Sequence, residues 1–458
     1  MIENDAFKLL LINLFHLNPD DIANILCTTF NKMMVLVVTL ADKHQACPYC
    51  GFTAPKIKEY VTKEITHSAL TTQKCIIKYR ARRYKCSCCG KTYYEFNPFV
   101  FKSQKISILT VHNILKDLKD FNETFTSVAR RYHVSPTSVS TIFDNHVDIG
   151  RNPLPEIINF DEVYAFKSEK SKYVCVLLDF KKQIPVDVLP NRKKEYLLNY
   201  FQKIPLEERK KVKYACSDMY EVYRDVVHKV FPESKHLLDY FHLSQDFHKK
   251  MNEVRIKVMK GYKDDKASDE YYLLKKFNWL LFKNPEDEDK YGRLFDVERE
   301  RKYNSHFKSY MNYYDLRKKL LEINNDLTIC YSLKLELVDF YSKSTIDNAQ
   351  VNLEHLIRSF IDTNIEEMIK FSNNLINWKQ EIINSFTIVG TEYKVEADKG
   401  QVVVCNKKVN NAIIENRNKI IKCIKNNANG YTNWSRFRNR VMYVLDPNAT
   451  FSLEPREK

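Results

Sequence analysis

The sequence contains no hydrophobic run long enough to cross a membrane. Its longest apolar run extends from Met33 to Leu40 with one threonine inside it, far short of the ~20 residues that a spanning helix needs. The N-terminus also lacks the basic region that precedes the apolar segment of a secretory signal. We therefore expect a soluble, cytoplasmic protein with no membrane partner.

Acidic residues are too few to balance the basic ones. The chain has 73 Lys+Arg against 58 Asp+Glu, a formal net charge of +15. This excess favours a polyanionic partner such as DNA, and a solvated basic surface is the alternative. Between Asn406 and Arg440, Glu415 is the single acid among nine basic residues. At 458 residues the chain is too long for one ordinary core, so we expect three or more structural units.

The cysteines lack the pattern of a disulfide scaffold. Twelve are spread over the chain, and they cluster only as the C-x-x-C pairs Cys47/Cys50 and Cys86/Cys89. Two such knuckles, each followed by glycine and joined by strand-like sequence, predict a zinc ribbon with one structural Zn²⁺ ion on four thiolates. Unliganded buried thiols are the alternative. Cys88 is a competing ligand, although the glycine after Cys89 matches the glycine after Cys50.

Residues Glu123 to His146 follow the pattern of two short helices joined by a turn. Ser135 and Pro136 predict the N-cap and the first position of the second helix. The pattern predicts a helix-turn-helix DNA-binding unit, although short helices with apolar stripes are more often plain core. The candidate DNA contacts are the two neighbouring arginines and the polar residues of the second helix: Arg130, Arg131, Thr137, Ser138, Ser140 and Thr141.

After Pro155 the periodicity changes from that of helices to that of strands. We expect three consecutive strands at 157–166, 173–180 and 183–189, then a helix at 193–203, a strand at 212–216, a helix at 220–230 and a strand at 235–238. This order predicts a mixed α/β, ribonuclease H-like catalytic core with its first strand at the centre of the sheet. Asp161 on that strand and Asp218 after the fourth strand should then lie side by side.

The segment between Asp218 and Glu415 is too long to be a loop. From Phe241 to about Ser385 it is polar with apolar residues at helical spacing, so we expect a large α-helical insertion in the core. A hairpin with its turn at Asp398-Lys399-Gly400 then leads to the helix that carries Glu415. On that helix the expected core face consists of Ile413, Ile420, Ile421 and Ile424, and the opposite face of Asn411, Glu415, Lys419 and Lys422.

Three acids, Asp161, Asp218 and Glu415, are candidate metal ligands. Phosphodiester transfer through two Mg²⁺ (or Mn²⁺) ions needs hard oxygen ligands that hold the metals ~3.5–4 Å apart. Two strand-borne aspartates and one helical glutamate can converge in this way. For each acid alone, a solvated surface carboxylate is the alternative. Glu162 points to the opposite face of its strand from Asp161, so only one of the two can be a ligand.

Several motifs, in order, resemble one family. The run N-N-A-I-I-E-N-R-N-K is similar to the C-terminal signature of the ISL3 family of insertion-sequence transposases, whose acidic triad gives them the name DDE. The resemblance extends to C-P-Y-C-G, R-R-Y-K-C-S-C-C-G-K, F-T-S-V-A-R-R-Y-H-V-S, F-D-E-V and L-D-Y-F-H. It implies that Asp161, Asp218 and Glu415 bind the catalytic metals. It also implies DNA cutting at the terminal inverted repeats of a mobile element and joining of a 3′-hydroxyl to target DNA. Asn416 stands where family members often have glycine.

Other candidates belong to the surroundings of these acids. Asp239 and His242 are expected as a hydrogen-bonded pair near the active site. Tyr431, Trp434 and Phe437 are expected in the core. The candidate phosphate contacts are Arg192, Lys419, Lys422, Arg436 and Arg438. Because two element ends must be handled together, we expect a homodimer.

The sequence therefore predicts a multidomain transposase. The expected parts are a lead-in (1–40), the zinc ribbon (41–97), the helix-turn-helix unit (98–150), the first part of the core (151–245), the insertion (246–390), the second part of the core (391–445) and a tail (446–458). There are two alternative hypotheses. The protein is a DNA-binding regulator without catalysis, or it is a nuclease of the same fold that cuts without joining.

Overall fold

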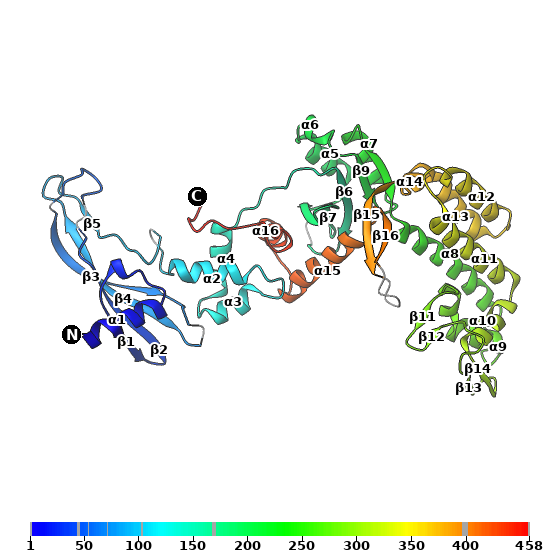
Figure 1. The fold of residues 1–458 in the computed structure, drawn as a ribbon, viewed down its shortest axis with the longest axis horizontal. Helices are drawn as coiled ribbons and strands as arrows, with labels where there is room; N and C mark the ends of the chain where they lie inside the picture. The colour runs from blue at the N-terminus through cyan, green and yellow to red at the C-terminus, as the bar shows by residue number, and fades with distance from the viewer. Residues whose placement is uncertain are drawn as a thin grey trace.

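The computed structural model describes residues 2–43, 46–53, 55–70, 72–101, 104–166, 171–395 and 402–456. The molecule is elongated, with an N-terminal sheet at one end, a second sheet in the middle and a large helical unit at the other end (Figure 1). Among the helices described, none combines the length and apolar character needed to span a bilayer.

The N-terminal sheet is preceded by α1 (Ile2–Leu14) and the 3-10 turn η1 (Pro19–Asp21). It has the strand order β1-β2-β4-β3, and β5 pairs with β4. The bounds are β1 (Ile22–Phe30), β2 (Met33–Leu40), β3 (Lys56–Thr66), β4 (Cys75–Lys85) and β5 (Thr92–Tyr94). Because β2 pairs in parallel with β4, residues on both sides of position 40 share one sheet and one core.

Three helices follow, α2 (Ile108–Asp117), α3 (Phe125–Arg131) and α4 (Pro136–His146). The predicted helix pair is confirmed. The Ser135 side chain caps α4 by accepting from the Ser138 N–H, and Pro136 occupies the first turn. Val139, Ile142 and Phe143 are buried against the other two helices.

The central sheet has the order β10-β9-β6-β7-β8. Its strands are β6 (Ile157–Val163), β7 (Val174–Asp179), β8 (Ile184–Leu189), β9 (Tyr214–Ser217) and β10 (Lys235–Leu238). Strand β6 pairs antiparallel with β7 and parallel with β9, and β9 pairs in parallel with β10. The five strands agree with the predicted ones, with the first strand ending earlier than expected. The predicted turn around residues 168–171 lies largely outside the described residues.

Helices cover both faces of this sheet. The apolar cluster on one face includes α5 (Lys194–Gln202) and α7 (Glu221–Val230), and α6 (Leu206–Arg209) lies nearby. On the other face, α15 (Ala412–Asn427) and α16 (Trp434–Leu445) pack against β6, β7 and β8. As predicted, Tyr431, Trp434 and Phe437 pack in this core. The chain thus returns to the sheet after a long excursion.

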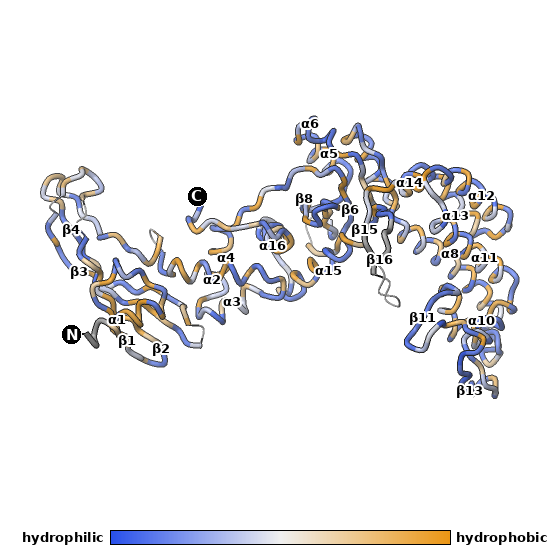
Figure 2. The backbone as a smooth tube through the Cα atoms, in the orientation of Figure 1, coloured by the Kyte–Doolittle hydropathy of each residue, from blue (hydrophilic) through white to orange (hydrophobic). Residues whose placement is uncertain are grey.

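That excursion is the predicted helical unit. It contains α8 (Tyr240–Lys260), α9 (Asp269–Lys276), the 3-10 turn η2 (Asn278–Phe282), α10 (Tyr313–Glu322), α11 (Asn325–Lys343), α12 (Ala349–Ile361), α13 (Glu366–Asn377) and α14 (Lys379–Asn384). Two hairpins that the sequence did not predict interrupt it: β11 (Glu288–Asp289) with β12 (Gly292–Arg293), and β13 (Lys302–Asn304) with β14 (Ser309–Met311). Apolar and polar residues alternate along its helices (Figure 2), so each helix buries one face in a shared core.

The hairpin β15 (Ile388–Val395) and β16 (Val402–Lys408) leads back to the sheet, and its predicted turn lies outside the described residues. After α16 the C-terminal segment lies along the three-helix unit. Phe451 packs against its core, and the Ser452 and Arg456 N–H groups donate to the carbonyls of His146 and Asn145. The last described residues therefore contact the end of α4.

Candidate active site and sulfur cluster

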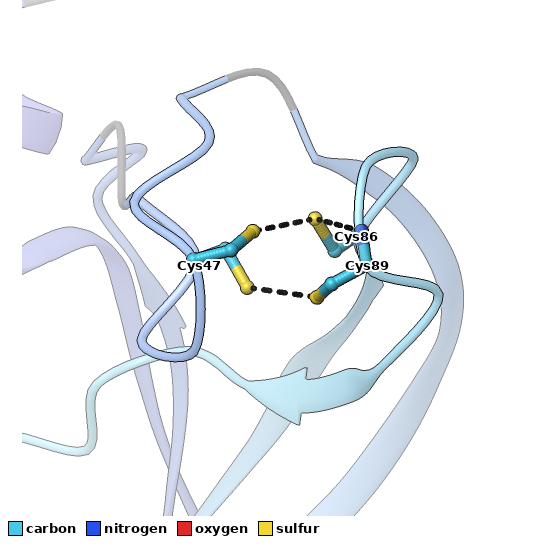
Figure 3. Close-up of side chains that lie close together, drawn as sticks. Cys47, Cys86 and Cys89 are labelled. Carbon is cyan, nitrogen blue, oxygen red and sulfur yellow. Dashed lines mark hydrogen bonds between the residues drawn. The ribbon is translucent and has the colours of Figure 1, made fainter.

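Four cysteine sulfurs meet at the end of the N-terminal sheet. The Sγ atoms of Cys47, Cys50, Cys86 and Cys89 all lie within 4.8 Å of one another. The Sγ atoms of Cys47 and Cys89 are 3.7 Å apart (Figure 3), and those of Cys50 and Cys86 are 3.5 Å apart. Cys89 rather than Cys88 completes this group, as the matching of the two knuckles predicted.

The backbone shapes each knuckle in the same way. Gly51 N–H donates to the Cys47 carbonyl and Gly90 N–H to the Cys86 carbonyl. Both glycines have φ near +70°, which a side chain would strain. The Cys89 N–H donates to the Cys86 Sγ and lowers the pKa of that thiol to about 7. The thiolate form, which binds metals, is therefore favoured there.

Three aspartates lie in one row across the central sheet. The register pairs Asn159 with Cys216, and Leu238 with Ser217. If the pairing is extended beyond the last bonded residues, Asp161 lies opposite Asp218, and Asp218 lies opposite Asp239. These are the carboxyl ends of three neighbouring parallel strands, where open α/β sheets bind ligands.

Helix α15 brings the glutamate to this row. Asn411, at its N-cap, is fully buried, and its carbonyl accepts from the Glu415 N–H. The ligand atoms of Glu415, Asp239 and His242 lie within 4.8 Å of one another. Asp161 is close enough for its pKa to be shifted by the charges of four residues, Asp218, His242, Glu415 and Asp239. The structure thus brings the three predicted acids and the two candidate neighbours to the same end of the sheet, although Asp161 and Asp218 are not part of the group within 4.8 Å.

The acids are held in a poorly solvated, mutually repulsive arrangement. Burial, reinforced by the charge of Asp218, raises the pKa of Asp161 to about 7. Burial likewise raises the pKa of Asp218 and of Asp239, while the nearby His242 opposes the shift in both. Such clustered carboxylates need a positive charge to ionise together.

Several polar atoms of the site have no partner among the described residues. They are Asp218 Oδ1, Asp239 Oδ2 and His242 Nε2. Asp239 Oδ2 and His242 Nε2 are 4.0 Å apart, so the hydrogen bond expected between them is not formed. Asp218 and His242 also line an open hollow with Met219, Gln245, Asp246 and Lys249. Orphaned carboxylate oxygens beside an opening fit divalent cations.

Glu162 belongs to the other face of the sheet. Its carboxylate forms an ion pair with Arg192 and accepts from the Tyr223 hydroxyl at 3.2 Å. The Arg192 guanidinium also lies 4.7 Å from the ring centres of Tyr173 and Tyr220. Asp161, not Glu162, therefore faces the site, and Arg192 is held by internal contacts.

The other predicted DNA contacts fall into three groups. Arg131 is paired with Asp117 and Glu123, Arg436 with Asp144 at 2.6 Å, and Arg438 with Asp187 at 2.7 Å. These three arginines hold elements of the protein together. The exposed group contains Arg130, Thr137, Thr141, Lys419 and Lys422. Ser138 and Ser140 are half-buried, and their hydroxyls contact Ser135 and the Thr137 carbonyl.

Sequence reasoning missed an asparagine network beside the acids. Asn418 Nδ2 donates to Asp161 Oδ2 at 2.7 Å. Asn159 Nδ2 donates to Asn411 Oδ1 at 2.7 Å, which ties β6 to the start of α15. Because Asn411, Glu415 and Asn418 are spaced by four and three residues, the helical period is the signal that links them.

The predicted faces of α15 need correction. Ile414, Asn418, Ile421 and Ile424 are its buried residues, whereas Ile413 and Ile420 are half-buried. Asn411, expected on the opposite face, is buried at the N-cap. The helix is turned so that its polar Asn418 reaches the sheet.

Comparison with known proteins shows the family of the chain. A family model described as a transposase, DDE_Tnp_ISL3, matches residues 158–397, more than half of the chain. The matched segment includes Asp161 and Asp218 and ends before Glu415. The chain is also 19% identical over 410 residues to the transposase for insertion sequence element IS1001 of Bordetella parapertussis, covering 89% of this chain and 90% of that protein. The fold and site define a protein with a buried acidic centre, and the chain belongs to the ISL3 family of DDE transposases.

Proposed function

We propose that this transposase binds the terminal inverted repeats of its insertion sequence and catalyses metal-dependent DNA strand cleavage and strand transfer. The observation that carries the proposal is that Asp161, at the carboxyl edge of the central sheet, lies close enough to Asp218 and Glu415 for both charges to raise its pKa, while Asp218 Oδ1 has no partner among the described residues. A surface acid would instead be hydrated and unperturbed.

The strand order supports a ribonuclease H-like core. Three antiparallel strands followed by two parallel ones, with β6 in the centre, form the arrangement expected for that fold. The helical unit from α8 to α14 is then an insertion, and α15 supplies the last acid. The N-terminal sheet and the three-helix unit precede this core as separate DNA-binding parts.

The acids are suited to hold two Mg²⁺ or Mn²⁺ ions. Bound there, such ions supply the activation of the attacking oxygen and the stabilisation of the leaving oxygen of a phosphodiester. Asp161, Asp218 and Glu415 are the ligands in this proposal. Asn418 fixes the orientation of Asp161 through its hydrogen bond. Asp239 and His242 line the same site, and the imidazole offers a proton donor or acceptor there.

The four-cysteine cluster is suited to one structural Zn²⁺ ion. Four sulfurs leave no open ligand position, so the site stabilises the fold and does not perform chemistry. We assign the end of the N-terminal sheet to a zinc ribbon that positions the protein on DNA.

The three-helix unit is suited to read DNA as a helix-turn-helix. The exposed Thr137 and Thr141 and the half-buried Ser138 line a hollow on α4 together with Lys105. Arg130, Lys419 and Lys422 are placed to contact phosphates. Arg131, Arg192, Arg436 and Arg438 act through the internal ion pairs that orient these surfaces. Two copies of the chain would handle the two ends, in the cytoplasm.

Incubation of supercoiled plasmid carrying both element ends with the protein and Mg²⁺ tests this proposal. We expect cleavage at the ends and joined products. Asp161→Asn, Asp218→Asn and Glu415→Gln should each lower the cleavage rate at least ~10³-fold without weakening end binding. Asp264→Asn, an exposed acid of the insertion, is the matched control. Binding without cleavage would favour a regulator, and cleavage without joining a nuclease.

A further inference from the structure

A second group of metal-ligand side chains lies where the helical insertion meets the central sheet. His228 belongs to α7, His236 to β10 and Glu381 to α14. One ligand atom from each lies within 4.8 Å of the other two. Helix α14 packs beside β10, so the group joins two structural units (Figure 1).

The buried histidine has an unused ligand atom. His236 is 1% exposed, and its Nδ1 has no hydrogen-bond partner among the described residues. Nδ1 lies 3.9 Å from Glu381 Oε1, and the His228 Nε2 lies 4.0 Å from the same oxygen. Leaving a buried polar atom unpaired is costly, which suggests a partner between these groups.

The contacts on the other side of His236 fix its protonation. His236 Nε2 is 2.9 Å from Ser217 Oγ, and that hydroxyl donates to the Asp218 carbonyl. Because the serine hydroxyl hydrogen is used, His236 Nε2 must be the N–H donor. In the neutral ring Nδ1 then carries the lone pair, 3.9 Å from Glu381 Oε1. Histidines that bind metals donate their other ring N–H in this way.

We propose that His228, His236 and Glu381 bind a transition-metal ion of the Zn²⁺ class. Two imidazole nitrogens and one carboxylate oxygen suit Zn²⁺ or Co²⁺, whereas Mg²⁺ prefers oxygen ligands alone. Ligand atoms on one such ion lie about 3–3.5 Å apart, so small shifts of the exposed His228 and of the Glu381 carboxylate close the set. The site is distinct from both the acids and the cysteines.

The ion would lock the insertion onto the sheet. Glu381 and Trp378 lie at the start of α14, where Arg224 of α7 stacks on Trp378 at 4.3 Å. Through Ser217, His236 also touches the backbone of Asp218. The ion would therefore hold the strand end that presents Asp218. This proposal does not depend on the proposed cleavage reaction.

Metal content tests the proposal in the full-length protein. Protein prepared with Zn²⁺ in excess Mg²⁺, which occupies the acidic centre, and freed of loose metal should contain two zinc equivalents per chain. His228→Gln, at a side chain that is 56% exposed and thus safe for folding, should contain one. His355→Gln, an exposed histidine of α12, is the matched control and should keep two.

Co²⁺ separates the two sites by spectroscopy. The cysteine site gives sulfur-to-metal charge-transfer absorption, and the histidine site adds ligand-field bands without it. His228→Gln should weaken Co²⁺ binding at the histidine site at least ~10-fold and leave the charge-transfer bands of the cysteine site unchanged. A single zinc equivalent in the wild type, or two in His228→Gln, would overturn the proposal.

Discussion

The cysteine cluster and the acidic cluster are built in opposite ways. The four sulfurs come from two short knuckles whose turns are set by local backbone geometry. The acids come from β6, the ends of β9 and β10, and α15, which the chain reaches only after the whole insertion. The four sulfurs form a closed group, whereas the acids leave oxygens without partners among the described residues. A closed set stabilises a fold, and an open set leaves room for a substrate.

The largest effect should come from breaking the closed set. Cys86→Ser removes one of four ligands, so the protein should lose one zinc equivalent and much of the folding energy of the N-terminal sheet, on the order of 5 kcal/mol or more. Cys88→Ser should retain both the zinc equivalent and the folding energy. Metal content and calorimetry measure the two properties. Loss of zinc in Cys88→Ser with retention in Cys89→Ser would reverse the assignment of the fourth ligand.

The acidic site should weaken the fold when it is empty of divalent ions. The pKa of Asp161 is raised from 3.8 to about 7, so the folded state favours the protonated acid. Its contribution to stability is complete below about pH 4 and is lost as the pH rises through about 7. Without Mg²⁺ or Mn²⁺, Asp161→Asn should therefore raise stability by about 1–4 kcal/mol at pH 8.

Calorimetry at pH 8 and pH 5 checks this prediction. The stabilisation should shrink at pH 5, where the wild-type acid is mostly protonated, and Mn²⁺ should stabilise the wild type but not Asp161→Asn. Asp264→Asn, in an exposed loop, should change neither value. An equal gain at both pH values would show that repulsion among the acids is not its cause.

A neighbour of the acids should affect rate more than stability. Asn418→Ala removes the hydrogen bond to Asp161 Oδ2, so the carboxylate is less well oriented. We expect a 10–100-fold lower cleavage rate, partly recovered at high Mg²⁺. Asn416→Ala, an exposed residue of the same helix, should be close to wild type. Equal rates for the two variants would remove Asn418 from the site.

The smallest effect should come from the exposed lysines of α15. Lys422→Ala should weaken DNA binding a few-fold for any sequence and lower the salt dependence by about one counterion. Lys266→Ala, an exposed lysine of the insertion, is the control. Fluorescence anisotropy over a series of salt concentrations measures both quantities. A change of sequence preference would mean that Lys422 reads bases instead.

Local features and the strand order were predictable from the sequence, and the partners of individual side chains were not. The knuckles and the Ser135–Pro136 helix start depend on neighbouring residues, so pattern alone placed them. The strand order followed from the alternation of elements, which brought Asp161 and Asp218 together. Arg436 and Arg438 form ion pairs with acids that are distant in the sequence, Asp144 and Asp187. Pattern could not distinguish these internal pairs from DNA contacts.

The same limit explains why the boundary predicted at position 40 falls inside one sheet. The parallel pairing of β2 with β4 depends on how the chain returns after the first knuckle, and no local signal encodes it. The role of Asn418 was not predicted because the core face expected for α15 consisted of isoleucines alone. Only its hydrogen bond to Asp161 explains why it is buried.

Anomalous diffraction from crystals of the full chain soaked in Mn²⁺ tests the central claim most directly. We expect anomalous peaks in contact with the carboxylates of Asp161, Asp218 and Glu415, and their loss in Asp218→Asn. Manganese bound elsewhere, with these three carboxylates free of it, would contradict the assignment of the active site.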